Sequence, residues 1–327
     1  MTQTALQNTS PAELGWSRLP AAYAIPASPP TLGEAREYCA RLARTHYENF
    51  SVASWFLPKR LRQHFFNVYA YCRISDDLGD EVGDTSASLE LLGQWQRELD
   101  ACYAGSPKHP VFVALAETVR QFDIPKHEFS DLLIAFRQDQ TITRFETFND
   151  VLGYCRYSAN PVGHLVLYLC GYRDAGRQRL SDFTCTALQL ANFWQDVSVD
   201  YAKDRIYLPL EDLRRFNVTE DGIARKQNTP AFCAMMKFEV ERARDWFHQG
   251  LPLIGSVDHE LAIDLDLFSR GGLEILNAIE KQRYAVLGNR PAISKPRKLA
   301  LVARAAAGKL FGVRTPAKPD AIRGNRA

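Results

Sequence analysis

Apolar residues recur at helical spacing along most of the chain from residue 31 onward. Thr31 and Glu34 fit a capping box at the start of the first such pattern, and Pro125 and Pro230 stand near the starts of two later ones. The predicted helices span residues 31–46, 59–82, 86–103, 110–122, 126–140, 146–157, 161–171, 179–202, 230–250, 258–288 and 295–311. The pattern therefore predicts a largely helical protein.

Strand signals are few. No strand alternates with a helix in βαβ fashion, no glycine-rich phosphate loop follows a strand, and no repeat recurs at a fixed period. This disfavours a built-in nucleotide-binding domain. We expect a single all-α domain over residues 31–290, because no linker interrupts it. Residues 1–30, rich in Pro, Ala and Ser, are expected to form a flexible arm, and residues 291–327 a tail.

The composition is that of an ordinary globular protein, with 46% hydrophobic and 24% charged residues among 327. No apolar run reaches the roughly 18 residues of a membrane span, and the N-terminus does not read as a secretory signal. A cytoplasmic location is therefore expected. The seven cysteines show no paired metal spacing, so they are interpreted as reduced thiols.

The net charge of +2 is unevenly distributed. Residues 291–327 hold nine Lys and Arg against one Asp, a local +8, which leaves −6 for residues 1–290. Leu299, Val302, Leu310 and Phe311 interleave with these basic residues, which is typical of an amphipathic helix. Such a tail would rest peripherally on an anionic inner membrane, or it would serve only to keep the protein soluble. Nucleic acid is disfavoured as a partner, because the basic cluster is confined to one end.

The first of two acidic edges lies in "VYAYCRISDDLGDE", residues 68–81. Tyr69, Arg73, Asp76 and Asp80 follow one another at steps of four, three and four, and Asp77 stands beside them. On a helix this spacing forms one continuous stripe. The other faces are apolar, so we expect a central helix that does not turn this edge toward bulk water.

The second acidic edge lies in "QLANFWQDVSVDYAKDRIYLP", residues 189–209. Gln189, Asn192, Asp196 and Asp200 follow at steps of three, four and four, and Asp204 continues the series. A solvated face with local ion pairs is the alternative interpretation. Closely spaced carboxylates with few cations beside them favour a counter-charge instead, since like charges at this spacing repel.

A hard divalent cation supplies that counter-charge. Mg²⁺ prefers oxygen ligands and is typically held by one or two carboxylates together with substrate phosphates. None of the residues named in the two stripes is His or Cys, which argues against zinc and softer metals. Two such edges facing each other would hold a Mg²⁺–diphosphate unit, and Arg73, Lys203 and Arg205 would bind its phosphate oxygens.

These residues resemble a known family. "YAYCRISDDLGD" and "QLANFWQDVSVDYAKDRIYLP" are similar to the two signatures of the squalene/phytoene synthase family, in the same order and with 120 residues between Asp76 and Asp196. Similarity continues through "HYENFSVASWFLP", "DLLIAFRQD" and "YCRYSANPVGHLVLYLCG". The resemblance implies a class I isoprenoid synthase fold, an all-α helical bundle with a central cavity, and Mg²⁺-dependent ionisation of a prenyl diphosphate.

The resemblance also implies roles for individual residues. Those matching the metal-binding motifs are Asp76, Asp77, Asp80, Asp196 and Asp200. Those matching substrate-binding positions are Arg73, Gln189, Asn192, Lys203 and Arg205. Tyr69 and Tyr207 match hydroxyl groups that line the site. Many family members have Arg where this chain has Gln195, and the "SANPVG" turn also departs from the common pattern. Asn160 in that turn would position a water molecule, or it is simply a turn residue before Pro161.

Within the family, the motifs are most similar to the bacterial hopanoid-pathway branch called HpnC. This branch is implied to ionise presqualene diphosphate and to capture the cation with water, giving hydroxysqualene. A presqualene diphosphate synthase and a flavin-dependent reductase would complete squalene synthesis. Two alternatives stay open: head-to-head condensation of farnesyl diphosphate by the same fold, and a helical assembly factor without catalytic activity.

Overall fold

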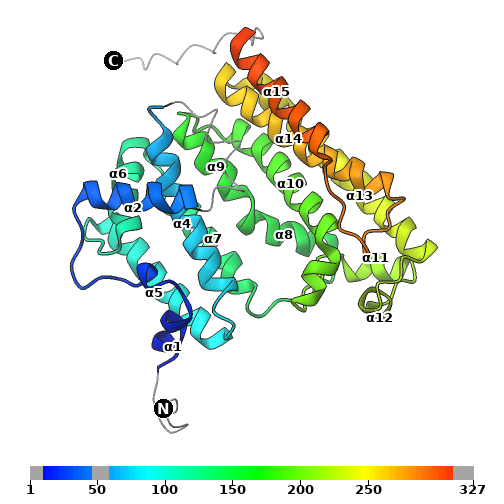
Figure 1. Cartoon of the computed structure of the whole chain (residues 1–327), viewed down its shortest axis with the longest axis horizontal. Coiled ribbons are helices and arrows are strands. Elements are labelled where there is room, and N and C mark those ends of the chain that lie inside the picture. Colours follow the sequence, from blue (N-terminus) through cyan, green and yellow to red (C-terminus); the bar gives the residue numbers. More distant parts are fainter. Residues whose placement is uncertain (1–9, 46–58, 312–327) are drawn as a thin grey trace, which may run out of the picture.

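The computed structural model describes residues 10–45 and 59–311, and within them the secondary structure is helical apart from turns and one isolated parallel bridge between Arg144 and Ile206 (Figure 1). This confirms the all-α prediction. In chain order the elements are α1 (Pro11–Arg18), η2 (Ala21–Tyr23), α2 (Leu32–Thr45), α4 (Arg62–Asp80), α5 (Thr85–Ala104), α6 (Pro110–Phe122), α7 (His127–Gln138), α8 (Phe148–Ser158), α9 (Asn160–Leu169), α10 (Ala175–Ala202), α11 (Leu210–Arg215), α12 (Glu220–Ala224), α13 (Pro230–Gly250), η3 (Leu251–Ser256), α14 (His259–Lys281) and α15 (Lys295–Phe311).

Local sequence signals explain where several helices begin. The Thr31 hydroxyl and the Glu34 carboxylate exchange hydrogen bonds with each other's backbone, so the predicted capping box at α2 is confirmed. Pro230 is the first residue of α13, where its missing N–H is no loss. Every helix predicted from the apolar spacing is present. The short α1, α11 and α12 were missed, because five to eight residues carry too little periodicity.

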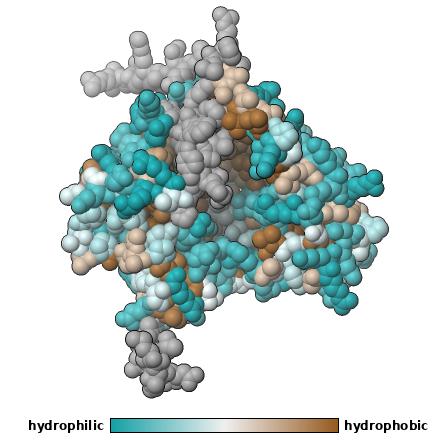
Figure 2. All heavy atoms as spheres, in the orientation of Figure 1, coloured by the Kyte–Doolittle hydropathy of each residue, from teal (hydrophilic) through white to brown (hydrophobic). Residues whose placement is uncertain are grey.

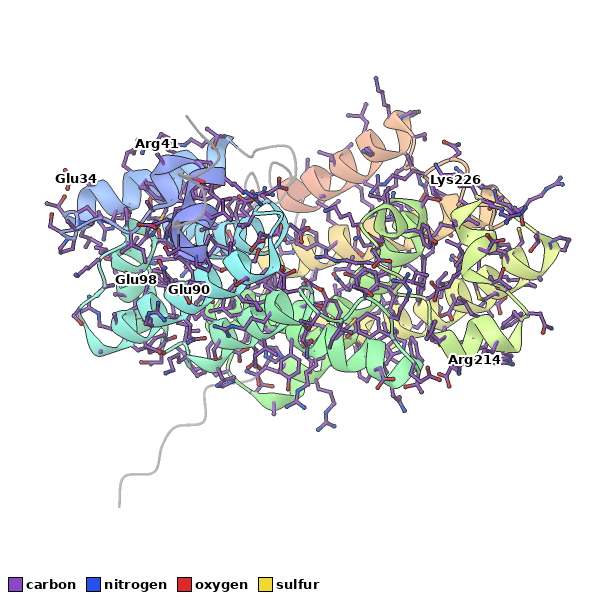
Figure 3. All side chains as sticks on the ribbon, turned by 90° about the horizontal axis from the view of Figure 1, so that it is seen from below. Glu34, Arg41, Glu90, Glu98, Arg214 and Lys226 are labelled. Atoms are coloured by element: carbon purple, nitrogen blue, oxygen red, sulfur yellow. The ribbon has the colours of Figure 1, made fainter. Side chains whose placement is uncertain are left out.

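The apolar core falls into two main clusters on either side of the middle of the molecule. One joins α2, α4, α5, α6 and α7 around Tyr71 and Trp95, and the other joins α10, α13 and α14 around Trp194 and Phe247. In the view of Figure 3, Glu34 and Arg41 of α2 lie at one end, and Arg214 and Lys226 lie at the other. Helices α9 and α10 occupy the space between these ends (Figure 1).

Two glycines allow close packing against α10. A Cβ on Gly163 of α9 would lie 2.2 Å from the Ser181 hydroxyl oxygen and 2.6 Å from the Cys185 sulfur. A Cβ on Gly250 of α13 would lie 2.3 Å from the Thr184 hydroxyl oxygen and 2.9 Å from its backbone nitrogen. Any side chain at these positions would push the neighbouring helices apart. The glycines thereby hold the N-terminal half of α10 firmly between α9 and α13.

The described part of the predicted N-terminal arm is packed on the domain. Ser10 and Glu13 form a capping box at the start of α1, and Leu19 and Tyr23 are buried. The Tyr23 hydroxyl donates a hydrogen bond of 2.8 Å to the Asp77 carboxylate on α4. Residues 1–9 of the arm lie outside the described residues.

At the other end of the chain, α15 lies along α14. His259 hydrogen-bonds the Gly308 carbonyl oxygen at 3.1 Å, and Arg297 donates to Glu274 at 2.8 Å, so the two helices run antiparallel. Among the helices of the described residues, none is long and apolar enough to cross a membrane. The predicted peripheral membrane contact of the tail stays a prediction.

Candidate active site

An apolar cavity of about 360 Å³ lies between α4, α9, α10 and α14. Phe65 and Val68 of α4, Leu167 of α9, Leu188 of α10 and Leu265 of α14 are among the residues that line it. Figure 2 shows the molecule hollowed toward the centre of this face, with hydrophobic residues at the wall of the hollow. A cavity of this chemistry suits a hydrocarbon chain and excludes bulk water.

Helices α4 and α10 have the same arrangement of apolar and acidic residues along their length. In each, the N-terminal half contributes apolar residues to the cavity, such as Phe65 and Leu188, and the C-terminal half carries the predicted acids. Since positions three or four apart share a helix face, the acidic stripe continues the cavity-lining stripe. The Asp80 carboxylate of α4 contacts Lys203 and Arg205, which follow α10, so the two acidic ends meet.

Asp76 and Asp77 are neighbours in sequence but have different surroundings. Asp77 is buried, and its carboxylate oxygens accept hydrogen bonds from the Arg73 guanidinium and from the Tyr23 hydroxyl. The Asp76 side chain is 49% exposed, and its carboxylate lies 3.6 Å from Arg73. Burial and the nearby Asp80 carboxylate raise the pKa of Asp76 to about 6. Asp76 therefore faces the site, and Asp77 faces the interior.

Asp80 is the point where α4 meets the segment after α10. Its carboxylate oxygens lie 3.0 Å from the Lys203 ammonium and 3.1 Å from the Arg205 guanidinium. Partial burial opposes ionisation, but these two cations hold the pKa of Asp80 below its usual value. One predicted metal ligand and two predicted phosphate-binding cations thus satisfy one another in this structure.

On α10, Asp196 and Asp200 also differ. Asp196 is buried, and Arg290 donates to both of its carboxylate oxygens, one at 2.9 Å. Burial, and next the adjacent Asp196 carboxylate, raise the pKa of Asp200 to about 7. Carboxylates that repel each other in this way attract a cation. Asp204, one step further, is instead an exposed partner of Arg144 at 2.9 Å.

Gln195 and Arg290 form a contact that the sequence did not predict. Gln195 Nε2 donates to the Pro291 carbonyl oxygen at 2.6 Å, and Arg290 Nη2 donates to Gln195 Oε1 at 3.2 Å. The segment after α14 is therefore fastened to α10 beside the second acidic motif. No local pattern marks Arg290, which lies 94 positions after Asp196. The sequence offered one hint of this contact, which is Gln195 at a position where many family members have Arg.

Comparison with known proteins identifies the family. The sequence model of the squalene/phytoene synthase family matches residues 43–297, which is most of the chain. The chain belongs to the squalene/phytoene synthase family. Among curated proteins, the hydroxysqualene synthase of Rhodopseudomonas palustris is 32% identical over 231 residues, covering 69% of this chain and 78% of that protein. The 15-cis-phytoene synthase of a Synechocystis strain is 29% identical over 279 residues, covering 81% and 82%.

Solved structures agree with this family membership. The squalene synthase HpnC from Alicyclobacillus acidocaldarius is 42% identical, with a TM-score of 0.74 over 83% of this chain and 98% of that one. A dehydrosqualene synthase is 28% identical, with a TM-score of 0.76 over 86% and 98%. The fold is therefore the isoprenoid synthase helical bundle predicted from the sequence.

Three predicted family positions lie along the face that joins the cavity to the acids. Tyr69 lines the cavity. Asn192 is exposed and Gln189 is half-buried on α10, between the cavity-lining Leu188 and the acids. These placements are compatible with the roles that the family resemblance implies, which stay predictions.

Two predicted catalytic residues do not line the described cavity. Tyr207 is buried, and its ring stacks on Phe193 with centroids 3.8 Å apart and planes 5° apart. The side-chain oxygen of Asn160, at the start of α9, accepts a hydrogen bond from the Thr186 hydroxyl at 3.0 Å. In this structure Asn160 therefore ties α9 to α10, and the proposed placement of a water molecule by this residue stays a prediction.

Asp139 at the end of α7 adds a further carboxylate to the polar end of the site. It accepts a hydrogen bond of 3.0 Å from the Tyr154 hydroxyl, and its backbone oxygen lies 3.4 Å from Arg205. Burial raises the pKa of Asp139 to about 6, against the opposing effect of Arg205. The "FRQD" motif thus reaches the same cluster of charges as the two family signatures.

The donor set fits a hard divalent cation. The acids at this end offer carboxylate oxygens without His or Cys, which is the ligand chemistry that Mg²⁺ prefers. Within the described residues, no three His, Cys, Asp or Glu side chains converge as a ready-made metal site. Asp80 and Asp196 are instead held by cations of the chain itself. Mg²⁺ binding would require these ion pairs to exchange.

Proposed function

We propose that this chain ionises presqualene diphosphate in a Mg²⁺-dependent reaction and captures the resulting cation with water, giving hydroxysqualene. The observation that carries the proposal is the meeting of two acidic helix ends beside one apolar cavity. The similarity to a hydroxysqualene synthase and to a squalene synthase HpnC supports this choice within the family. A presqualene diphosphate synthase would supply the substrate, and a flavin-dependent reductase would consume the product.

The acidic ends would provide the charge for departure of the diphosphate. Bound Mg²⁺ acts as a Lewis acid and neutralises charge that develops on a leaving group. Asp76, Asp80, Asp196 and Asp200 would hold it through carboxylate oxygens, while Asp77 stays engaged by Arg73 and Tyr23. If Asp80 held the metal, Lys203 and Arg205, which now pair with it, would be free to donate hydrogen bonds to the phosphate oxygens.

The cavity would control the fate of the organic cation. Its apolar walls keep bulk water away, so a carbocation inside it does not meet solvent before it rearranges. The ring faces of Phe65 and Tyr69 border the cavity and would each stabilise a positive charge by about 0.5–2 kcal/mol. A single positioned water molecule is then the nucleophile that forms the alcohol.

Turnover of purified protein tests the proposal directly. Protein is incubated with presqualene diphosphate and Mg²⁺ in the absence of any reductant, and the products are separated by chromatography and mass. The expected product is a C30 alcohol together with inorganic diphosphate. No consumption of presqualene diphosphate under these conditions would overturn the proposal.

A second candidate is the head-to-head condensation of two farnesyl diphosphates. The similarity to phytoene synthases and to a dehydrosqualene synthase favours this reaction. Farnesyl diphosphate and Mg²⁺ replace presqualene diphosphate in the same assay. Accumulation of presqualene diphosphate would assign the condensation to this chain, whereas unchanged farnesyl diphosphate would leave water capture as the sole reaction.

A further inference from the structure

Helix α15 presents a basic surface to solvent. Lys295, Lys298 and Leu299 are exposed in its first turns, and the Leu299 side chain is 70% exposed. Residues 291–308 carry four cations and no acid. Arg297 and Arg304 pair with acids of α14, at 2.8 and 3.6 Å, and this fastens the helix to the domain.

Lys295 and Lys298 have no such partner. Within the described residues, no acid lies within 4.0 Å of the Lys295 or Lys298 ammonium group. Leu299 lies next to them, and Ala303 and Ala307 follow at steps of four, so an exposed apolar row runs along the basic helix. A basic helix with an exposed apolar row is typical of segments that lie in the interface of an anionic bilayer.

Helix α15 is separated from the cavity by a single helix, α14. Its C-terminal half packs on the N-terminal half of α14, through His259 and Gly308. The same half of α14 lines the cavity with its opposite side, and Phe268 there is 40% exposed. Val162 of α9, which also lines the cavity, is 42% exposed. The hollow and the surface over α15, where hydrophobic and hydrophilic residues mix, are seen on one face of the molecule (Figures 1 and 2).

We propose that α15 docks the protein on an anionic lipid bilayer through Lys295, Lys298 and Leu299. The identity of the lipid that would enter the cavity rests on the proposed function, but the docking does not. An acidic protein partner would match the lysines, yet it would leave the apolar row without a role. A bilayer accounts for both features, because its headgroups carry the charge and its acyl boundary takes up apolar side chains.

Vesicle flotation of the full-length protein tests the docking. Protein is mixed with vesicles of phosphatidylcholine alone or of phosphatidylcholine with phosphatidylglycerol, without substrate or Mg²⁺. We expect flotation with the anionic vesicles only. The double substitution Lys295→Gln and Lys298→Gln should weaken partitioning roughly 25-fold, since each basic residue near an anionic surface contributes roughly fivefold.

A matched control removes two exposed cations outside α15. Arg41→Gln with Lys108→Gln lowers the net charge equally, but Arg41 lies on α2, far from α15 (Figure 3). This variant should float like the wild type. Equal loss with the control, or equal flotation with neutral vesicles, would overturn the proposal. Leu299→Gln should weaken partitioning by several-fold without any change of charge.

A second measurement separates this inference from the proposed function. Turnover of presqualene diphosphate is followed with substrate supplied in detergent and with substrate supplied in anionic vesicles. The Lys295→Gln, Lys298→Gln variant should match the wild type in detergent and fall behind it with vesicles. If no variant turns over substrate at all, flotation still decides the docking. Equal turnover of both proteins from vesicles would count against a role for α15 in delivery.

Discussion

The acidic ends of α4 and α10 carry similar stripes of residues but complete them with partners from different parts of the chain. On α4, Asp77 is satisfied by Arg73 of the same helix and by Tyr23 from the N-terminal segment. On α10, Asp196 is satisfied by Arg290 from the segment after α14. The contacts of Asp77 lie within the domain, whereas Arg290 covers Asp196 from the solvent side. Similar acidic motifs therefore serve different structural purposes.

The comparison separates acids that stabilise the fold from acids available to a metal. Asp77 is buried, and its removal would take away the carboxylate that accepts hydrogen bonds from the half-buried Arg73 and from the buried Tyr23 hydroxyl. Asp76 and Asp200 have pKa values of about 6 and 7, raised by burial and then by neighbouring carboxylates. A cation held by either carboxylate would relieve both effects on that group. We therefore expect the largest catalytic losses at Asp76 and Asp200.

The largest expected effect is that of Asp200→Asn on turnover. Loss of one carboxylate that would hold Mg²⁺ should reduce kcat by about a thousandfold, because the metal's contribution to the transition state is several kcal/mol. The control is Asp204→Asn, in the turn just after the end of α10, where the side chain is 81% exposed and pairs with Arg144. Steady-state kinetics should show little change for the control. Equal kinetics for both variants would remove Asp200 from the metal site.

The stripes themselves could be predicted from the sequence, and so could the fold. Periodicity sufficed because Asp76 and Asp80 share a face at any register of the helix, and the same holds for Asp196 and Asp200. The burial of Asp77 could not be predicted. It stands about 100° around the helix from Asp76, and whether that direction is core depends on where Tyr23 packs.

Contacts between residues that are far apart in the sequence could not be predicted either. Arg290 reaches Asp196 from 94 positions away, and it follows the end of α14 in a turn that has no helical pattern. At Tyr207 the ring stacks on Phe193, while burial and next the nearby Asp139 carboxylate raise the pKa of the phenol, so the role predicted for this residue stays a prediction. Family resemblance places such residues near a site, but packing decides which groups they face.

The second prediction addresses stability on the α4 side. Asp77→Asn should lower the free energy of unfolding by about 2–3 kcal/mol, because it removes the buried charge that pairs with Arg73 and leaves Arg73 only the more distant Asp76 carboxylate, at 3.6 Å. Asp76→Asn, with a half-exposed side chain, should change it by less than about 1 kcal/mol. Urea unfolding followed by circular dichroism measures both. The distinction between the two acids fails if Asp77→Asn is the milder change in stability and the greater loss of Mg²⁺ binding.

The third prediction uses an ion cluster outside the site as a reference. His164 of α9 contacts Glu128 of α7 at 3.0 Å and Asp182 of α10 at 2.8 Å. Burial opposes protonation, but hydrogen bonds to the two carboxylates raise the pKa of His164 to about 9. The charged imidazole therefore joins three helices purely for stability.

Replacing His164 should give a stability difference that depends on pH. Because the folded pKa exceeds the unfolded value of 6.5, the stabilisation is complete below pH 6.5 and is lost as pH rises toward 9. Unfolding of the wild type and of His164→Gln should differ by about 2 kcal/mol at pH 6 and by much less at pH 9.5. A gap that stays constant over this range would show that His164 acts through packing alone. Turnover at neutral pH should change little.

The smallest expected effect concerns the contact between Arg290 and Asp196 on the α10 side. In the substrate-free protein, Arg290 and a divalent cation would compete for the same Asp196 carboxylate. Arg290→Gln should therefore raise the affinity for Mg²⁺ about tenfold, which is the effect of removing a competing ion pair worth about 1.4 kcal/mol. Isothermal titration without substrate measures this, with Arg297→Gln as a control on an ion pair remote from the acids.

Whether Mg²⁺ affinity rises or falls in the Arg290 variant decides how the acidic ends of α4 and α10 differ. If Arg290 only shields Asp196, its loss strengthens metal binding and leaves the fold intact, unlike the loss of the Arg73 contact on α4. If Mg²⁺ affinity falls instead, Arg290 is required to hold Asp196 in a geometry that binds the metal, and both acidic ends would depend on their arginines for structure. Gln195 would then matter as well, because it fixes Arg290 and Pro291 in place.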